Sequence, residues 1–152
     1  MSQDNALSIL NDIEIVCKKR NVKLTNQRKI VLSIMLQAQK AMSAYDLLDL
    51  LKQEEPQAKP PTIYRALDFL LEQGFIHKVE SSNSYIICPH FSHPNHLSIL
   101  FICDNCKQIL EKNSHEIENN LLQLATQNRF AVKHSIIEIH GLCPSCHKIL
   151  TD

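Results

Sequence analysis

Two Cys-x-x-Cys pairs, Cys103/Cys106 and Cys143/Cys146, constrain this chain of 152 residues more than any other feature. One such pair is weak evidence for a metal site. Two pairs strongly indicate zinc, because each pair grips one ion and four thiolates complete a closed tetrahedral site. The 36 residues between the pairs exceed the usual spacing of a zinc ribbon, so folded chain must fill the gap. Its patterns predict two strands, a helix capped by Ser114 and a strand over 131–141, that is, a small α/β unit.

Three other uses of the cysteines fit the sequence less well. Residues 143–147 match the Cys-x-x-Cys-His of covalent haem attachment, but that chemistry requires export, and the N-terminus lacks the pattern of a signal peptide. A thioredoxin-type dithiol explains one pair but not two. A zinc deaminase requires His-x-Glu before Pro-Cys-x-x-Cys, whereas Pro144 lies inside its pair and His115 directly precedes Glu116. We therefore expect a structural zinc in a cytoplasmic protein.

The overall composition limits the possible partners. In a reducing compartment, six Cys and eight His indicate metal binding or catalysis rather than disulfides. No apolar run is long enough to span a bilayer, so we expect no membrane partner. The net charge is zero, so any surface for nucleic acid must be a local patch. Residues 18–29 hold six basic residues and no acid.

The first half of the chain is predicted to be mainly helical. Apolar residues recur at helical spacing over residues 4–19. Thr25 and Ser43 are good N-caps for two further helices. A fourth helix, over 61–73, begins with proline and ends at Gly74, as helices commonly do.

A β-hairpin is predicted to follow these helices. Two β-prone runs, 75–79 and 84–88, flank a polar turn. Helices followed by a hairpin are the outline of a winged helix, whose last helix enters the major groove of DNA while the hairpin touches the backbone. Arg65 projects from the polar face of the last helix, where it could read guanine, and Thr62 near the helix start suits a phosphate. An ordinary amphipathic helix with a solvated polar face would show the same pattern.

Two cysteines lie outside the pairs. Cys17 is expected to be a small buried apolar residue of the first helix. Cys88 ends the second hairpin strand beside a segment that holds His90, His93 and His96. Because this segment joins the helical half to the zinc half, a metal bound there could affect both.

Several stretches resemble the ferric uptake regulator family of metal-dependent repressors, most closely its zinc uptake regulator branch. They are RNVKLTNQRKIVLSIM, SAYDLLDLL, EPQAKPPTIYRALDFLLEQGFIHKVESSNSY, FICDNC and HGLCPSC, and the resemblance covers residues 10–147. It implies an α+β fold: a winged-helix DNA-binding domain over 1–82, a hinge over 83–96, and a dimerisation and metal-binding domain over 97–152. It also implies a homodimer that binds a palindromic operator of zinc-uptake or homeostasis genes when loaded with zinc, with no enzymatic activity and no small-molecule substrate.

The resemblance implies roles for particular residues. The four paired cysteines match the structural zinc site of the family. A regulatory zinc site of its zinc branch is matched by His77, Cys88, His96 and Glu111. Tyr45 and Arg65 match positions that read bases. Thr62 and Tyr64 lie on the same helix as Arg65, and Lys59 is expected to reach phosphate, so all five are expected to contact DNA.

A zinc ion held by all four regulatory ligands would tie the two domains at a fixed angle. In a dimer this angle sets the separation of the two Arg65-bearing helices against the repeat of DNA. The Cys88 thiolate makes the set softer than the nitrogen–oxygen sets used for iron or manganese.

Other functions remain open at this level. An iron-, manganese- or peroxide-responsive regulator of the same family is disfavoured by Cys88. A zinc enzyme is disfavoured because no residue pair resembles an open catalytic zinc with its general base. A zinc-ribbon interaction module leaves Arg65 and the basic run unexplained. No role can be assigned to His90, His93 or His134, and the residues before the first cysteine pair lack the histidines that many relatives carry there.

Overall fold

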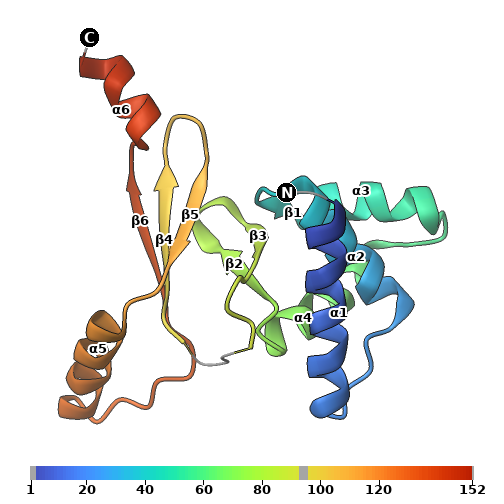
Figure 1. Cartoon of the computed structure of the whole chain (residues 1–152), viewed down its shortest axis with the longest axis horizontal. Coiled ribbons are helices and arrows are strands. Elements are labelled where there is room, and N and C mark those ends of the chain that lie inside the picture. Colours follow the sequence, from blue (N-terminus) through green and yellow to red (C-terminus); the bar gives the residue numbers. More distant parts are fainter. Residues whose placement is uncertain (1–2, 93–95, 152) are drawn as a thin grey trace. The chain divides into compact units, whose positions relative to one another are not determined.

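The computed structural model describes residues 3–92 and 96–151, which belong to two compact units divided between residues 94 and 95 (Figure 1). The first unit includes most of the segment 83–96 that we expected as a hinge. The reason is that β3 (Ser84–Ile87) pairs with β2 (Ile76–Val79) in the sheet of this unit. In the described parts of the chain, no helix combines the length and apolarity needed to cross a membrane.

Four helices build most of the first unit, and their ends follow the predicted capping residues. The Thr25 hydroxyl accepts a hydrogen bond from the backbone N–H of Arg28 at 3.4 Å, and the Ser43 hydroxyl accepts one from Asp46 at 3.1 Å. Gly74 adopts φ +76°, a conformation that glycine reaches without strain and that ends the fourth helix. The helices are α1 (Gln3–Lys19), α2 (Asn26–Ala38), α3 (Ala44–Glu54) and α4 (Pro60–Glu72).

The hairpin of the first unit is a wing with one additional strand. β2 and β3 are antiparallel and are joined by a short 3-10 turn over Glu80–Ser82, where a four-residue polar turn was predicted. A two-residue strand that the sequence analysis missed, β1 (Met42–Ser43), adds to the free side of β3. The core that the helices and the sheet share includes the fully buried Ile13, Leu32, Leu47, Leu67 and Phe75.

Half of the basic run is engaged within the first unit, so the candidate patch at 18–29 is smaller than its charge suggests. Arg28 lies over an aromatic ring at 3.6 Å and is thereby held against the helices. The partners are the Gln73 carbonyl for Arg20, the Phe69 ring for Arg28 and the Glu14 carboxylate for Lys29.

The second unit is a three-stranded sheet with two helices. Its central strand, β4 (Ser98–Cys103), runs antiparallel to β5 (Ile109–Lys112) and parallel to β6 (Ile136–Gly141). The strand predicted over 131–141 begins only at Ile136, so the expectation that His134 lies on it is wrong.

The sequence predicted one of the two helices of this unit and missed the other. The predicted helix is α5 (His115–Gln127), and its Ser114 cap is confirmed by a hydrogen bond from the backbone N–H of Ile117 at 3.4 Å. No residue of α5 is buried, and Figure 1 shows it beyond one end of the strands rather than over their face. A final helix, α6 (Pro144–Thr151), was not predicted.

Candidate metal centre and nucleic-acid interface

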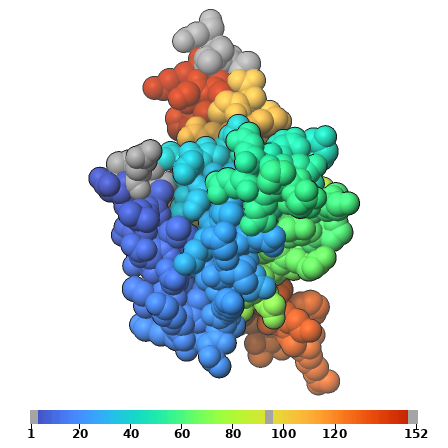
Figure 2. Space-filling model, turned by 90° about the vertical axis from the view of Figure 1, so that its right-hand side faces the viewer, coloured from blue at the N-terminus to red at the C-terminus, as the bar shows by residue number. Residues whose placement is uncertain are grey.

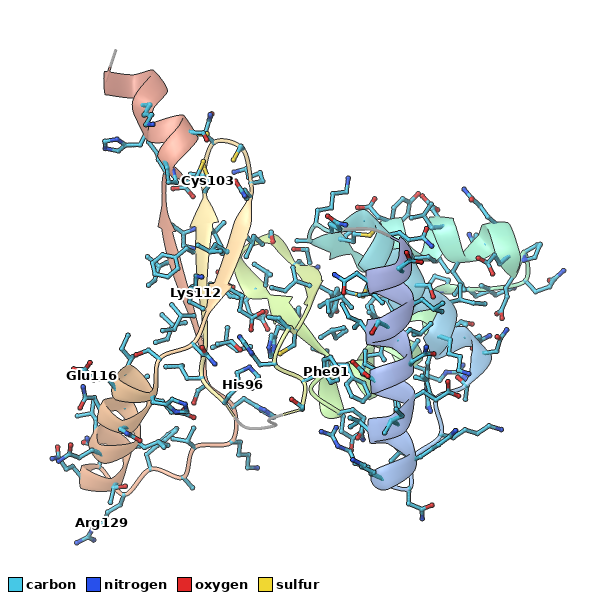
Figure 3. All side chains as sticks on the ribbon, in the orientation of Figure 1. Phe91, His96, Cys103, Lys112, Glu116 and Arg129 are labelled. Carbon is cyan, nitrogen blue, oxygen red and sulfur yellow. The ribbon has the colours of Figure 1, made fainter. Side chains whose placement is uncertain are left out.

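The four paired cysteines meet at one end of the second unit's sheet, where Figure 3 labels Cys103. Cys103 is the last residue of β4, Cys106 lies in the following turn, and Cys143 and Cys146 stand at the start of α6. Their four Sγ atoms all lie within 4.8 Å of one another. The Cys106–Cys143 distance of 3.7 Å matches the edge of about 3.8 Å that zinc–sulfur bonds of about 2.3 Å give a tetrahedron.

Hydrogen-bond donors around this cluster favour thiolates. The backbone N–H of Cys143 donates to Cys103 Sγ at 3.4 Å. The side-chain amide of Asn105 donates to Cys146 Sγ at 3.3 Å, a contact that sequence reasoning missed although Asn105 lies inside the first pair. Such donors stabilise sulfur ligands and hold them in place, so the residues present fit a structural zinc.

The thiols of this cluster differ in acidity. Hydrogen bonds from the backbone of Cys106 and Cys143 lower the pKa of Cys103 to about 6. A backbone hydrogen bond from Gln108 lowers the pKa of Cys106, but the Cys103 thiol, burial and the two remaining thiols outweigh it and raise this pKa to about 11. At neutral pH, Cys103 is therefore ready to bind a cation, whereas Cys106 must lose a proton to do so.

The first unit carries two of the four predicted regulatory ligands, one on β2 and one directly after β3. His77 lies on β2 opposite Ile86 of β3. Cys88 follows β3, and its backbone N–H donates to the Phe75 carbonyl at 2.9 Å, which continues the pairing by one step. Because side chains alternate along a strand, His77, Ile86 and Cys88 share one face, with His77 and Cys88 as diagonal neighbours.

The second unit carries the other two predicted ligands. His96 precedes β4, and Glu111 lies on β5 opposite Leu100. His96 Nε2 is 3.9 Å from a carboxylate oxygen of Glu111 and 3.1 Å from the Ser98 hydroxyl. Two imidazoles, one thiolate and one carboxylate form a set of donors that suits zinc.

The remaining histidines of interest are not part of these pairs. His90 contributes its backbone N–H, which donates to Cys88 Sγ at 3.4 Å. His93 lies outside the described residues. His134 is an exposed residue before β6.

The residues predicted to contact DNA lie at the start of α3 and at the start of α4. Tyr64 is 50% exposed, and Arg65 and Lys59 are exposed as well. The Thr62 hydroxyl accepts a hydrogen bond from the backbone N–H of Lys59 at 3.4 Å, so it helps to fix the start of α4. Tyr45, at the start of α3, is 73% exposed. In Figure 2, α1 to α3 form much of the visible surface of this unit, in dark blue through green.

Comparisons with known proteins agree over nearly the whole chain. The model of the ferric uptake regulator family matches residues 19–140. The zinc uptake regulation protein of Escherichia coli (strain K12) is 51% identical over 149 residues, which cover 98% of this chain and 87% of that protein.

Solved structures show the same likeness. A zinc uptake regulator in complex with zinc and DNA is 49% identical, with a TM-score of 0.91 and 100% of both chains covered. The holo form of XcZur is 35% identical, with a TM-score of 0.85, and the match covers 93% of this chain and 98% of that one.

Proposed function

Since this chain belongs to the ferric uptake regulator family, we propose that it is a zinc-responsive repressor that binds operator DNA as a homodimer. It is a regulator and not an enzyme. The observation that carries the proposal is the full-length likeness to a zinc uptake regulator in complex with zinc and DNA. In this proposal the protein acts in the cytoplasm on palindromic operators of zinc-uptake genes, and zinc is its co-repressor.

The proposal includes two zinc ions per chain. The structural ion binds Cys103, Cys106, Cys143 and Cys146, and the spacing of their sulfurs supports this assignment. The regulatory ion takes two ligands from each unit, His77 and Cys88 from the first and His96 and Glu111 from the second. Support comes from each pair separately: adjacent strands present the first pair, and the second pair lies within 3.9 Å. When bound, such an ion supplies a four-coordinate cross-link.

DNA recognition is assigned to α4 and its neighbour α3. An exposed arginine in the first turns of a helix can bond guanine O6 and N7 in a bidentate manner, and Arg65 occupies such a position. Tyr64 beside it and Tyr45 on α3 are exposed aromatic residues that would otherwise leave apolar surface in water. Lys59 and Thr62 at the start of α4 are assigned to phosphate.

The interface of the homodimer is assigned to the second unit. Ile117, Leu121 and Leu124 follow one another at helical spacing along α5, and their exposed fractions are 42%, 36% and 55%. An apolar stripe of this kind normally faces a core, yet no residue of α5 is buried in the single chain. A second copy of the chain is the occupant that would cover it.

The test is DNA binding by the full-length protein in zinc-buffered solution. The protein keeps its structural zinc, and free zinc, ferrous iron and manganese are titrated separately against a palindromic operator. Binding should appear with zinc at very low free concentration, and Cys88→Ser should abolish the response. Arg65→Ala should weaken binding by about 5- to 150-fold per half-site at saturating zinc, and the dimer loses this contact in both half-sites. Lys133→Ala, which removes an exposed positive charge from the second unit, is the matched control and should have little effect.

Two results would contradict the proposal. Binding that ignores zinc, or responds better to iron, would exclude the zinc co-repressor function. An Arg65→Ala loss no larger than that of Lys133→Ala would exclude α4 as the reading helix.

A further inference from the structure

One arginine of the first unit joins three separate parts of the chain. Arg20 directly follows α1, and one nitrogen of its guanidinium donates to the Gln73 carbonyl at 2.6 Å, at the end of α4. The other terminal nitrogen donates to the Phe91 carbonyl at 3.4 Å, beyond β3. The guanidinium carbon lies 5.4 Å from the centre of the Phe75 ring.

The aromatic rings below this guanidinium support the same segment. Phe75 and Phe91 meet edge to face, with ring centroids 6.0 Å apart and an interplanar angle of 75°. Figure 3 labels Phe91 next to α1. The segment after β3 is thus held from two sides, by the ring of Phe75 and by the fork of Arg20.

Cys88 lies at the start of this held segment. Its backbone N–H donates to the carbonyl of Phe75, the residue whose ring lies under Arg20. Its sulfur accepts a hydrogen bond from the backbone N–H of His90 at 3.4 Å, so the turn over residues 88–91 aims a donor at the sulfur. The conformation that places Cys88 Sγ therefore depends on contacts that converge on Arg20.

We propose that Arg20 is a positioning residue for Cys88, which fixes the sensor thiolate before zinc arrives. This inference rests on the proposed function, in which Cys88 is a regulatory ligand. Pre-organisation of a ligand lowers the cost of binding the ion, and it preserves the soft character that favours zinc over manganese. A lysine is a poor replacement for Arg20, because its three N–H groups sit on one nitrogen, whereas the planar guanidinium presents two separate nitrogens to two carbonyls while it stacks on a ring.

The chain offers a closely matched control in Arg28. Arg28 also lies over a phenylalanine ring, that of Phe69 at 3.6 Å, and it also donates to a backbone carbonyl, that of Lys23 at 2.6 Å. Arg28→Met therefore removes the same kinds of contact as Arg20→Met without touching the Cys88 segment. Tyrosine fluorescence reports the fold of the first unit, because all three tyrosines lie in it.

The experiment measures cobalt and zinc binding to the full-length protein with zinc kept in the structural site. Cobalt bound to a thiolate gives a charge-transfer band in the near ultraviolet, and the band lost in Cys88→Ser defines the Cys88 contribution. Arg20→Met and Arg20→Lys should each weaken binding by about 10- to 100-fold, the range typical of lost support around a ligand. They should also reduce the band per bound cobalt and the preference for zinc over manganese.

The controls separate positioning from general destabilisation. Arg28→Met should leave the metal affinity and the cobalt band unchanged, and Arg20→Met should cause no further loss of affinity in a Cys88→Ser background. If Arg20→Met does not fold by tyrosine fluorescence, Arg20→Lys carries the test.

Several outcomes would overturn the inference. It is wrong if both folded Arg20 variants bind like the parent, if Arg28→Met causes an equal loss, or if the loss persists without the Cys88 thiol. A Cys88→Ser protein with unchanged affinity and band would instead refute the regulatory site itself. The two failures are therefore distinguishable.

Discussion

Truncation of Leu124 to alanine should weaken the homodimer by a predictable amount. Full burial of a leucine side chain is worth about 1.5–3 kcal/mol. Leu124 is 55% exposed in the single chain, so roughly half of that gain, about 0.8–1.6 kcal/mol, is still available to a partner. A symmetric dimer contains the residue twice, so the loss is about 1.6–3.2 kcal/mol, or roughly 15- to 220-fold in the dimer dissociation constant.

Sedimentation equilibrium of the zinc-loaded protein over a range of concentrations gives this constant directly. The matched control is Leu7→Ala, since Leu7 is 60% exposed on α1 of the first unit. This control should dissociate like the parent, and thermal unfolding should show that both variants remain folded. A dissociation constant for Leu124→Ala within about threefold of the parent, or an equal loss in Leu7→Ala, would refute the assignment of the interface to α5.

Three further predictions concern the helix ends and the structural metal. Gly74→Ala should lower the unfolding free energy of the first unit by about 1–2 kcal/mol, because φ +76° strains any residue other than glycine. Gly141→Ala, at an ordinary φ, should leave the unfolding free energy unchanged. Denaturant titration measures both values, and equal losses in the two variants would contradict the prediction. Thr25→Ala should lower the unfolding free energy by about 1 kcal/mol, because the cap of α2 is lost, and Thr25→Ser should keep the parent value. An alanine variant with the parent's unfolding free energy in the same titration would show that the cap does not stabilise the protein. Zinc affinity of the structural site should rise at least tenfold per pH unit from pH 7 to 9, because Cys106, with a pKa of about 11, must release its proton, while Cys103, with a pKa of about 6, is already ionised. Competition with a chelator at several pH values measures this slope. Cys106→Ser should lower the slope of log affinity against pH by about one.

Local chemistry explains which parts of the fold were predictable. Thr25, Ser43 and Ser114 cap helices through hydrogen bonds to residues three positions away, so a short stretch of sequence is enough to find them. The sequence did not predict strand β1, because its two residues are extended only through their pairing with β3. Likewise, β-prone residues before Ile136 do not form strand, because pairing with β4 begins there, opposite Ser98.

The sites were predictable to different degrees for the same reason. Cysteine spacing alone predicts a four-thiolate site, because each pair binds from one turn. The proposed regulatory ligands follow no short regular spacing, so the sequence pointed only to Cys88 and the histidines after it, and the full set came from the family resemblance. The internal use of Arg20 and Arg28 could not be predicted, because their partners are backbone carbonyls and rings that the tertiary fold brings close. Side-chain charge in a sequence therefore does not by itself define a charged surface.

Strand β4 separates the two proposed zinc sites, and its length decides how strongly they influence each other. His96 precedes this strand and Cys103 is its last residue, so the seven residue steps between them span at most about 23 Å at about 3.3 Å per residue. The groups at both ends are largely buried, so salt screens them less than exposed charges, and the distance itself is what weakens their coupling. In the proposed arrangement, the charge state of the sensing ligands at one end of β4 would therefore have little effect on the affinity of the four cysteines at the other end.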